Sequence, residues 1–272
     1  MDRRAPHTGP YSPLVIGSDD PPPFETVNAS GQANLVLLCD HASNAIPQSL
    51  AQLGLLPEDL RRHIAWDSGA AEVTRILSRR LDAPAILSGY SRLVIDCNRK
   101  PGHETSIPVT SDGVVIPGNQ AIPPAEAARR VEAIFHPYHH AIEAAIDHVQ
   151  ARGLPPAIVA IHSFTPEMDG IVRPWHLSVL WDKDPRIPAP LLAALRSHDD
   201  LVVGDNEPYS GREHYGYSAE VHATAAGLPN ALIEIREDQI RDEYGIARYA
   251  DILGDALAET LADPGLYRVK NY

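Results

Sequence analysis

Short apolar runs alternate with amphipathic stretches along most of this chain, from about residue 34 onward. Brief, continuous apolar runs are typical of buried strands, and we predict strands at residues 35–38, 85–87, 92–95, 157–161, 177–180, 201–203 and 231–235. Helical spacing predicts helices at residues 71–81, 123–152, 191–196 and 244–261. This alternation indicates an α/β fold, with a mixed, mainly parallel sheet sandwiched by helices.

The first 32 residues do not follow this pattern. Pro10, Pro13 and the three prolines at residues 21–23 exclude regular structure there. We therefore interpret residues 1–32 as a Pro-rich N-terminal extension, either disordered or running as an extended arm over the domain. Residues 33–272 then form a single α/β domain, long enough to bury a sizeable core.

The charge balance narrows the choice of partners. Lys and Arg number 23 against 36 Asp and Glu, which gives a net charge of −13, so nucleic acid and anionic membranes would repel the chain. No apolar stretch approaches the ~18 residues of a membrane span, and no secretory signal opens the sequence. Two cysteines, Cys39 and Cys97, are too few for a disulfide framework. We expect a cytoplasmic enzyme, monomer or homodimer, acting on a small molecule.

Polar residues stand just after several predicted strands. His41 follows the first apolar run, His162 follows residues 157–161, Glu234 lies within the last run, and Asn98 and Arg99 follow residues 92–95. Because ligands of open α/β sheets bind beyond the carboxyl ends of the strands, these side chains together predict a site. Each also has a structural alternative: a hydrogen-bonded histidine, a buried carboxylate paired with an arginine, or a turn at residues 96–99.

The same residues suit a metal. A catalytic zinc takes three protein ligands and leaves one position for water, and His41 and His162 would supply two. Asp67 is our first choice for the third because a carboxylate balances the zinc charge, and Asn44 is its rival. Glu234 would be the general base that moves a proton from water to the leaving amine. Ligand type alone does not separate zinc from another divalent metal.

Arginines near these positions would bind carboxylates. Arg92 and Arg99 are placed to do so, since a planar guanidinium contacts a carboxylate through two hydrogen bonds. Arg173, in the loop at residues 173–176, is a further candidate, although a solvated loop fits that segment equally well.

Four segments resemble the N-formylglutamate amidohydrolase family. They are residues 40–44 (DHASN), 91–99 (SRLVIDCNR), 161–164 (IHSF) and 222–236, and the match runs in order from about residue 35 to 253. The resemblance implies a fold like that of zinc carboxypeptidases and aspartoacylase, of the phosphorylase/hydrolase-like type. It also implies hydrolysis of an N-acyl amino acid, a linear amide, in amino-acid metabolism.

The resemblance also assigns roles. His41 and His162 match the family's histidine ligands, and Glu234 matches the catalytic glutamate. Arg92 stands where aspartoacylase-like enzymes keep a second arginine, which would either polarise the scissile carbonyl or bind the carboxylate. Asn98 and Arg99 resemble the pair that grips the substrate carboxylate in aspartoacylase-like enzymes. His222 and Arg236, in the last matching segment, are further candidates for substrate contact, in addition to Arg173. Aspartoacylases carry a glutamate where Asn44 stands, which leaves the third ligand open.

Three other patterns carry weaker signals. Residues 216–220 nearly match a serine-hydrolase elbow but lack the final glycine. Residues 135–140 hold the densest group of histidines, in a helix interrupted by Pro137, where a packed kink or a metal site would fit. Phosphate-binding and dinucleotide-binding glycine loops are absent from the sequence, which argues against kinases and dehydrogenases.

The main hypothesis is therefore a zinc-dependent hydrolase that cleaves the N-acyl amide of N-formyl-L-glutamate or a related acidic N-acyl amino acid. One rival is a zinc peptidase or amidase with the same site. The other is a non-catalytic pocket for carboxylate ligands. This alternative remains because Asn44 stands where aspartoacylases carry a glutamate.

Overall fold

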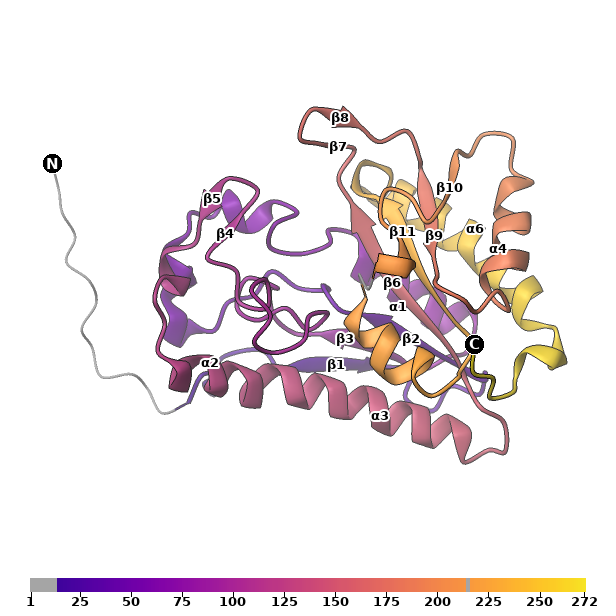
Figure 1. Cartoon of the computed structure of the whole chain (residues 1–272), viewed down its shortest axis with the longest axis horizontal. Helices are drawn as coiled ribbons and strands as arrows, with labels where there is room; N and C mark the ends of the chain where they lie inside the picture. The colour runs from indigo at the N-terminus through magenta and orange to yellow at the C-terminus, as the bar shows by residue number, and fades with distance from the viewer. Residues whose placement is uncertain (1–13, 214–215) are drawn as a thin grey trace, which may run out of the picture.

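The computed structural model describes residues 14–213 and 216–272. A seven-stranded sheet forms its centre, in the order β1-β3-β2-β6-β11-β9-β10 (Figure 1). Neighbouring strands pair in parallel except β1 with β3 and β11 with β9. The predicted mixed, mainly parallel sheet is confirmed. Its strands are β1 (Phe24–Val27), β2 (Leu35–Cys39), β3 (Ala85–Ser88), β6 (Ala157–Phe164), β9 (Leu177–Leu180), β10 (Val203–Asp205) and β11 (Asn230–Arg236).

Helices cover both faces of this sheet. Alternate residues of each central strand point to opposite faces, so Leu35 and Leu37 enter one apolar core while Val36 and Leu38 enter the other. The first core lies under α1 (Ala70–Arg80), α4 (Pro188–Arg196) and α6 (Glu243–Leu261). The second lies against a long helix made of α2 (Pro124–Arg130), a π-helical segment (Val131–Phe135) and α3 (His136–Gln150), along the lower edge of Figure 1.

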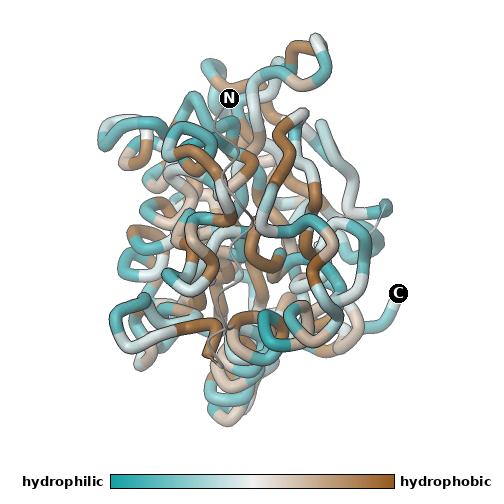
Figure 2. Tube along the Cα trace, turned by 90° about the vertical axis from the view of Figure 1, so that its left-hand side faces the viewer, coloured by the Kyte–Doolittle hydropathy of each residue, from teal (hydrophilic) through white to brown (hydrophobic). Residues whose placement is uncertain are grey.

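Two small hairpins project from this core on either side of the strand ends (Figure 1). Each turns at an Asp-Gly pair with positive φ, at residues 112–113 and 169–170, as a tight two-residue hairpin turn requires. The Cα trace coloured by hydropathy shows hydrophobic segments inside and hydrophilic turns outside (Figure 2). The hairpins are β4 (Thr110–Ser111) with β5 (Val114–Val115) and β7 (Glu167–Met168) with β8 (Ile171–Val172).

The remaining elements are short. A three-residue α-helix, α5 (Tyr217–Ala219), leads directly into a second π-helical segment, Glu220–Thr224. The 3-10 turns are Gln48–Gly54, Asp59–Arg61, Pro117–Asn119, Gly211–Glu213, Glu237–Gln239 and Pro264–Leu266. Within the described residues, no helix is long and apolar enough to cross a membrane.

Three expectations need correction. Residues 92–95 form a buried turn rather than a strand, because Leu93, Val94 and Ile95 fill the second core without pairing in the sheet. The extension is not free of regular structure, since β1 lies within it and pairs with β3. The strand expected at residues 201–203 begins only at Val203. Residues 1–13 of the extension lie outside the described residues.

Candidate active site

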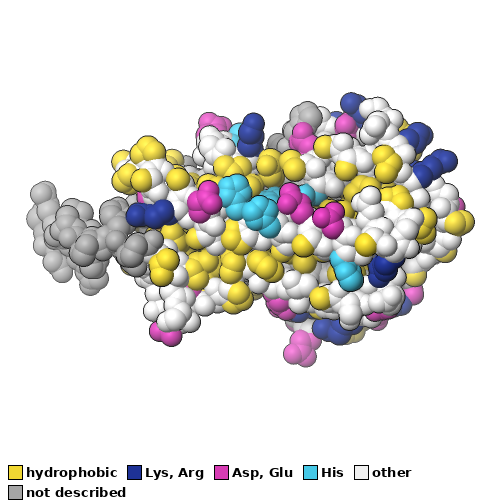
Figure 3. Space-filling view, turned by 90° about the horizontal axis from the view of Figure 1, so that it is seen from below, with side chains coloured by type: hydrophobic (Ala, Val, Ile, Leu, Met, Phe, Trp, Pro, Cys, Tyr) yellow, Lys and Arg dark blue, Asp and Glu magenta, His cyan; other side chains and the backbone are white. Residues whose placement is uncertain are grey.

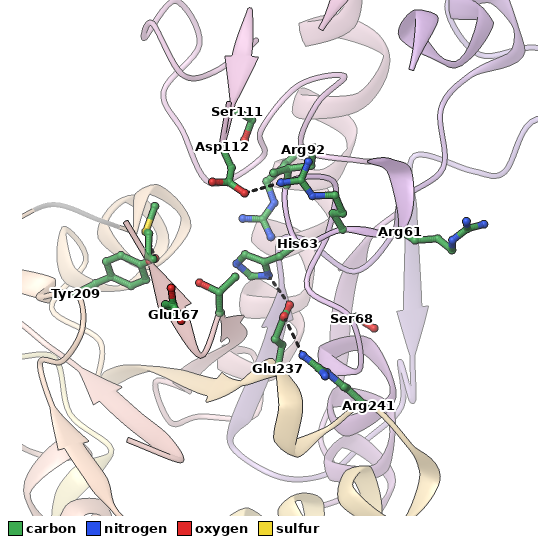
Figure 4. Close-up of a pocket in the computed structure, with 14 residues that line it drawn as sticks. Arg61, His63, Ser68, Arg92, Ser111, Asp112, Glu167, Tyr209, Glu237 and Arg241 are labelled. Atoms are coloured by element: carbon green, nitrogen blue, oxygen red, sulfur yellow. Dashed lines mark hydrogen bonds and ion pairs between the residues drawn. The ribbon is translucent and has the colours of Figure 1, made fainter. Parts of the chain in front are cut away.

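A cleft of about 690 Å³ opens beyond the carboxyl ends of the central strands. The segments that follow β2, β3, β6 and β11 all contribute to it, together with both hairpins, as expected for an α/β sheet. Figure 4 shows these side chains around the cavity, with His63 and Glu237 adjacent and Arg61 extending away from the others. Its lining comprises Arg61, Arg62, His63, Ile64, Ser68, Arg92, Ser111, Asp112, Thr165, Glu167, Met168, Tyr209, Glu237 and Arg241.

Beside Arg92 and Ser68, the structure brings three buried side chains together: His41, Asp67 and His162. One ligand atom from each lies within 4.8 Å of the others. The Nδ1 atoms of both imidazoles converge on Asp67 Oδ2, at 3.4 Å from His41 and 3.1 Å from His162. Two imidazole nitrogens and a carboxylate oxygen form a donor set that fits a divalent transition metal such as zinc.

Local folding explains why these residues meet. His41 follows the last residue of β2, and its carbonyl accepts a 2.9 Å hydrogen bond from the Asp67 amide, which sets the chain just before α1. His162 lies in β6 directly opposite Glu234 of the parallel strand β11. The backbone N–H of Ser163 also donates to Asp67 Oδ2, at 3.2 Å. The sheet and one helix start therefore fix all four side chains.

A second carboxylate holds the far side of each imidazole. Asp96 Oδ1 lies 2.8 Å from His41 Nε2, and Asp40 Oδ2 lies 2.9 Å from His162 Nε2. A carboxylate can only accept, so each Nε2 donates to its carboxylate partner, and each ring is held with Nδ1 turned towards Asp67. Carboxylates that orient histidines in this way accompany most protein metal sites.

The surrounding charges keep these carboxylates ionised. Burial alone would raise the pKa of Asp67, but Arg92 and His41 outweigh it and hold the pKa well below its usual range. Burial likewise opposes ionisation of Asp40, and its hydrogen bond with His162 lowers its pKa nevertheless. Burial would lower the pKa of His162, yet Asp40 and Asp67 raise it to about 10. A group of buried carboxylates that draws positive charge onto an imidazole is an environment that favours a cation.

Glu234 stands apart from this charged group. Its side chain is buried, and its Oε2 atom has no hydrogen-bond partner among the described residues. Burial raises its pKa to about 8, against the opposing effect of His162. A buried carboxyl group with an uncommitted oxygen next to a candidate metal site has the chemistry of a general acid or base.

Arg92 and His63 connect this buried group to the cleft. The Arg92 guanidinium contacts Asp67 Oδ1, and its Nε is buried without a partner in the described structure. His63 Nδ1 lies 3.6 Å from both Asp67 Oδ1 and Glu237 Oε2. Burial, followed by Arg92, lowers the pKa of His63 to about 3, so this ring is neutral.

The structure places the other predicted site residues away from this group. Asn44 donates its amide to the Leu60 carbonyl at 2.9 Å, whereas the Asp67 carboxylate contacts both histidines. Asn98 is buried behind Asp96, whose Oδ1 accepts from the Asn98 amide at 2.7 Å. Arg99 donates to the Asn98 carbonyl.

Three further candidates support the walls of the cleft or lie behind it. The Arg173 guanidinium packs over the ring of Tyr209, 4.9 Å from its centroid, and donates to its hydroxyl. Arg236 is paired with Asp238 and with backbone carbonyls. His222 Nε2 lies 2.7 Å from His139 Nδ1, within a buried pair that does not line the cleft. Their predicted contacts with substrate stay predictions.

Sequence reasoning missed the residues that orient the site. Asp40 directly precedes His41, and Asp96 directly follows the apolar run at residues 92–95. A carboxylate in the same position after two apolar runs was a signal that could have identified them. His63 lies four residues before Asp67, and no motif or predicted strand end in the sequence marked it as a site residue. Tyr138 and Ser218, which donate to Asp40, fall in the histidine-rich and elbow-like segments singled out for other reasons.

Comparison with known proteins is consistent with this geometry. A family model described as N-formylglutamate amidohydrolase matches residues 33–241. The gene product Atu2144 from Agrobacterium tumefaciens is 35% identical, with a TM-score of 0.87, and the match covers 91% of this chain and 98% of that one. An N-formylglutamate amidohydrolase from Ralstonia eutropha JMP134 is 20% identical, with a TM-score of 0.60 and coverage of 88% and 97%, and shows likeness of fold. No curated protein matches the sequence.

Proposed function

The chain belongs to the N-formylglutamate amidohydrolase family and is an amidohydrolase, and from this premise we propose that it is a metal-dependent enzyme that cleaves the N-acyl amide of N-formyl-L-glutamate or a related acidic N-acyl amino acid. The main support for metal dependence is that the Nδ1 atoms of two imidazoles converge on one oxygen of Asp67. The opposite nitrogen of each ring is held by a carboxylate. His41, Asp67 and His162 would hold the metal, with zinc as the first choice.

A divalent cation held there would supply Lewis-acid activation of water and of the amide carbonyl, and its charge would lower the pKa of Glu234. Glu234 Oε2, which no other described group engages, takes a proton from the attacking water and returns it to the nitrogen of the departing amino acid. The products are a free amino acid and a small carboxylate, so atoms and protons balance across the two steps.

Arg92 is positioned beside both the buried group and the cleft. Its contact with Asp67 fixes one end of the guanidinium, while its unpartnered Nε–H leaves a donor for the scissile carbonyl. A donor fixed before the reaction stabilises the oxyanion that develops as water adds. Burial around Glu234 and His162 excludes competing water.

The cleft itself suits an anionic substrate. Arg62 and Arg241 line it. Arg62 lies 2.6 Å from Asp112 and 3.5 Å from Asp59, and Arg241 lies 3.5 Å from Glu237. A substrate carboxylate can compete for these exposed guanidinium groups at little cost, because exposed ion pairs are weak. We include a cytoplasmic location in the proposal, supported by the two buried cysteines, Cys39 and Cys97, which are unpaired.

Metal content and hydrolysis test the proposal together. We expect about one zinc per purified chain, formate release from N-formyl-L-glutamate, and a slower rate on N-formyl-L-leucine. Asp67→Ala should lose the metal and the activity, whereas Asn44→Ala, the matched control at the rival position, should keep both. Zinc-free protein that hydrolyses the substrate at the full rate would disprove the metal dependence. Zinc-loaded protein that prefers the leucine substrate would disprove the substrate class.

A further inference from the structure

Asp40 is the buried centre of a network that reaches far beyond the cleft. Its Oδ2 atom accepts from His162 Nε2 at 2.9 Å, and its Oδ1 atom accepts from the hydroxyls of Tyr138 at 2.8 Å and Ser218 at 2.6 Å. Tyr138 and Ser218 are fully buried. One carboxylate thus receives three hydrogen bonds, with the two hydroxyls on one oxygen and the imidazole on the other.

The two hydroxyls come from elements that do not line the cleft. Tyr138 lies in α3, 98 residues from Asp40, and Ser218 lies in α5, 178 residues away. The Ser218 hydroxyl also lies 3.4 Å from the Cys97 carbonyl. Because the hydroxyl has one hydrogen and Asp40 is closer, it donates to the carboxylate. Its amide is fixed as well, by a 3.0 Å hydrogen bond to Asn98 Oδ1.

These donors restrict how Asp40 can turn. With Oδ1 saturated by two hydroxyl donors, Oδ2 is the oxygen left for the imidazole, and rotation of the carboxylate would break both outer hydrogen bonds. The ring of His162 is thereby fixed with Nε2 protonated and Nδ1 facing Asp67. We infer that Tyr138 and Ser218 are positioning residues for His162, acting through Asp40, an inference that rests on the metal site proposed above.

The two halves of the site differ in this respect. Asp96, the corresponding partner of His41, is held by the backbone amide of Asn98 in its own turn, at 2.7 Å. Asp40 depends instead on side chains from two distant elements. Removal of one hydroxyl should therefore loosen His162 and leave His41 unaffected.

Two segments with weak signals in the sequence, residues 135–140 and 216–220, each contribute one of these two hydroxyls. Ser218 is the serine of the elbow-like residues 216–220, yet its buried hydroxyl faces Asp40 rather than the cleft. Tyr138 is the tyrosine of the histidine-rich residues 135–140. Neither is expected to touch substrate.

Zinc affinity, measured on the full chain by competition with a chromophoric chelator, tests the assignment without reference to activity. We expect Tyr138→Phe and Ser218→Ala each to weaken zinc binding by about 3- to 10-fold, less than the 10- to 100-fold usual for the direct partner of a ligand. Asp40→Ala should weaken it by about 10- to 100-fold. In the Asp40→Ala background, the further change Tyr138→Phe should have no effect, because its acceptor is gone.

Matched controls separate positioning from loss of a buried hydroxyl. Tyr249→Phe and Ser78→Ala each remove the hydroxyl of a buried residue elsewhere, which donates to Gln239 and to the Ala83 carbonyl, respectively. Both variants should bind zinc like the original protein. Unchanged affinity in Tyr138→Phe and Ser218→Ala, with zinc bound normally by the original chain, would overturn this inference alone. Failure of the original chain to bind zinc would overturn it together with the proposed metal site. If Asp40→Ala does not fold, the single variants and their controls still decide the question.

Discussion

His41, Asp67 and His162 form the buried group beside Arg92, which we call the floor of the site, and are at most 4% exposed. The side chains of Arg62 and Asp112, at the rim of the cleft, are 41% and 63% exposed. The floor residues are cross-linked by hydrogen bonds from several elements. The rim residues meet mainly in single ion pairs that solvent screens. The floor is therefore suited to hold reacting groups in one geometry, and the rim to attract and release a charged molecule.

The largest effect should follow a change at the floor. Glu234→Gln keeps the shape of the side chain but removes the proposed base, so we expect kcat to fall by roughly 10²- to 10⁴-fold. Zinc content and KM should change little, because Glu234 is not among the three convergent groups. Steady-state kinetics of formate release measure this.

Glu167→Gln provides the comparison at the rim, where Glu167 lines the cleft. This variant should keep kcat within about threefold, as is usual for exposed charges. A Glu234→Gln enzyme with more than a tenth of the original kcat would show that another group moves the proton.

A smaller effect should distinguish the buried His139 from the exposed His140 on α3, through the pH dependence of protein stability. Burial, and then His222, lowers the pKa of His139 to about 4, while His140 on the same helix is exposed. The unfolded chain takes up a proton on His139 near pH 6.5, and the folded chain does so only near pH 4. Stability is therefore complete above pH 6.5 and falls as the pH drops towards 4. His139 should account for about 2 kcal/mol between pH 7 and pH 5.

Urea unfolding at pH 7 and pH 5 measures that contribution. His139→Gln should reduce the loss of unfolding free energy between the two pH values, although it lowers stability at pH 7. His140→Gln, the exposed neighbour, should leave the loss unchanged. An equal effect of both variants would mean that burial of His139 does not control its protonation.

The smallest effect should come from the rim. Arg241→Ala is expected to raise KM for N-formyl-L-glutamate by about threefold with kcat unchanged, since an exposed attraction contributes a fraction of 1 kcal/mol. High salt should raise KM of the original enzyme in the same direction and should affect the variant less. Arg61→Ala is the comparison, because Arg61 also lines the cleft but its side chain extends away from the other lining groups (Figure 4). A fall in kcat for Arg241→Ala would show that Arg241 takes part in the chemical step and not only in attracting the substrate.

The sequence identified the floor better than the rim. His41, His162 and Glu234 could be found because each adjoins an apolar run, and strand ends gather at one edge of a sheet. Asp67 could be chosen because a metal with two imidazole ligands favours a carboxylate. The rim comes from hairpins and loops whose positions depend on tertiary packing, so the predicted arginines Arg99, Arg173 and Arg236 do not line the cleft.

Other features of the fold and the site could not be predicted from local sequence patterns. Leu93, Val94 and Ile95 are as apolar as a buried strand, and only the structure shows that they fill a core as a turn. The contacts of Asp40 with Tyr138 and Ser218 join segments far apart in the chain, which no local pattern encodes. The densest histidine group lies over α3, where histidine side chains gather between acidic ones on an outer face (Figure 3), away from the convergent group.

The edge strand β1 affects where the chain can be cut. The family match begins at residue 33, yet β1, at Phe24–Val27, pairs along β3, and its Glu25 bonds Arg75 of α1 at 2.6 Å. A protein trimmed to the family boundary would expose the backbone donors and acceptors of β3 to other molecules. Unprotected edges of this kind promote aggregation. The segment that covers β3 therefore lies outside the residues that match the family model.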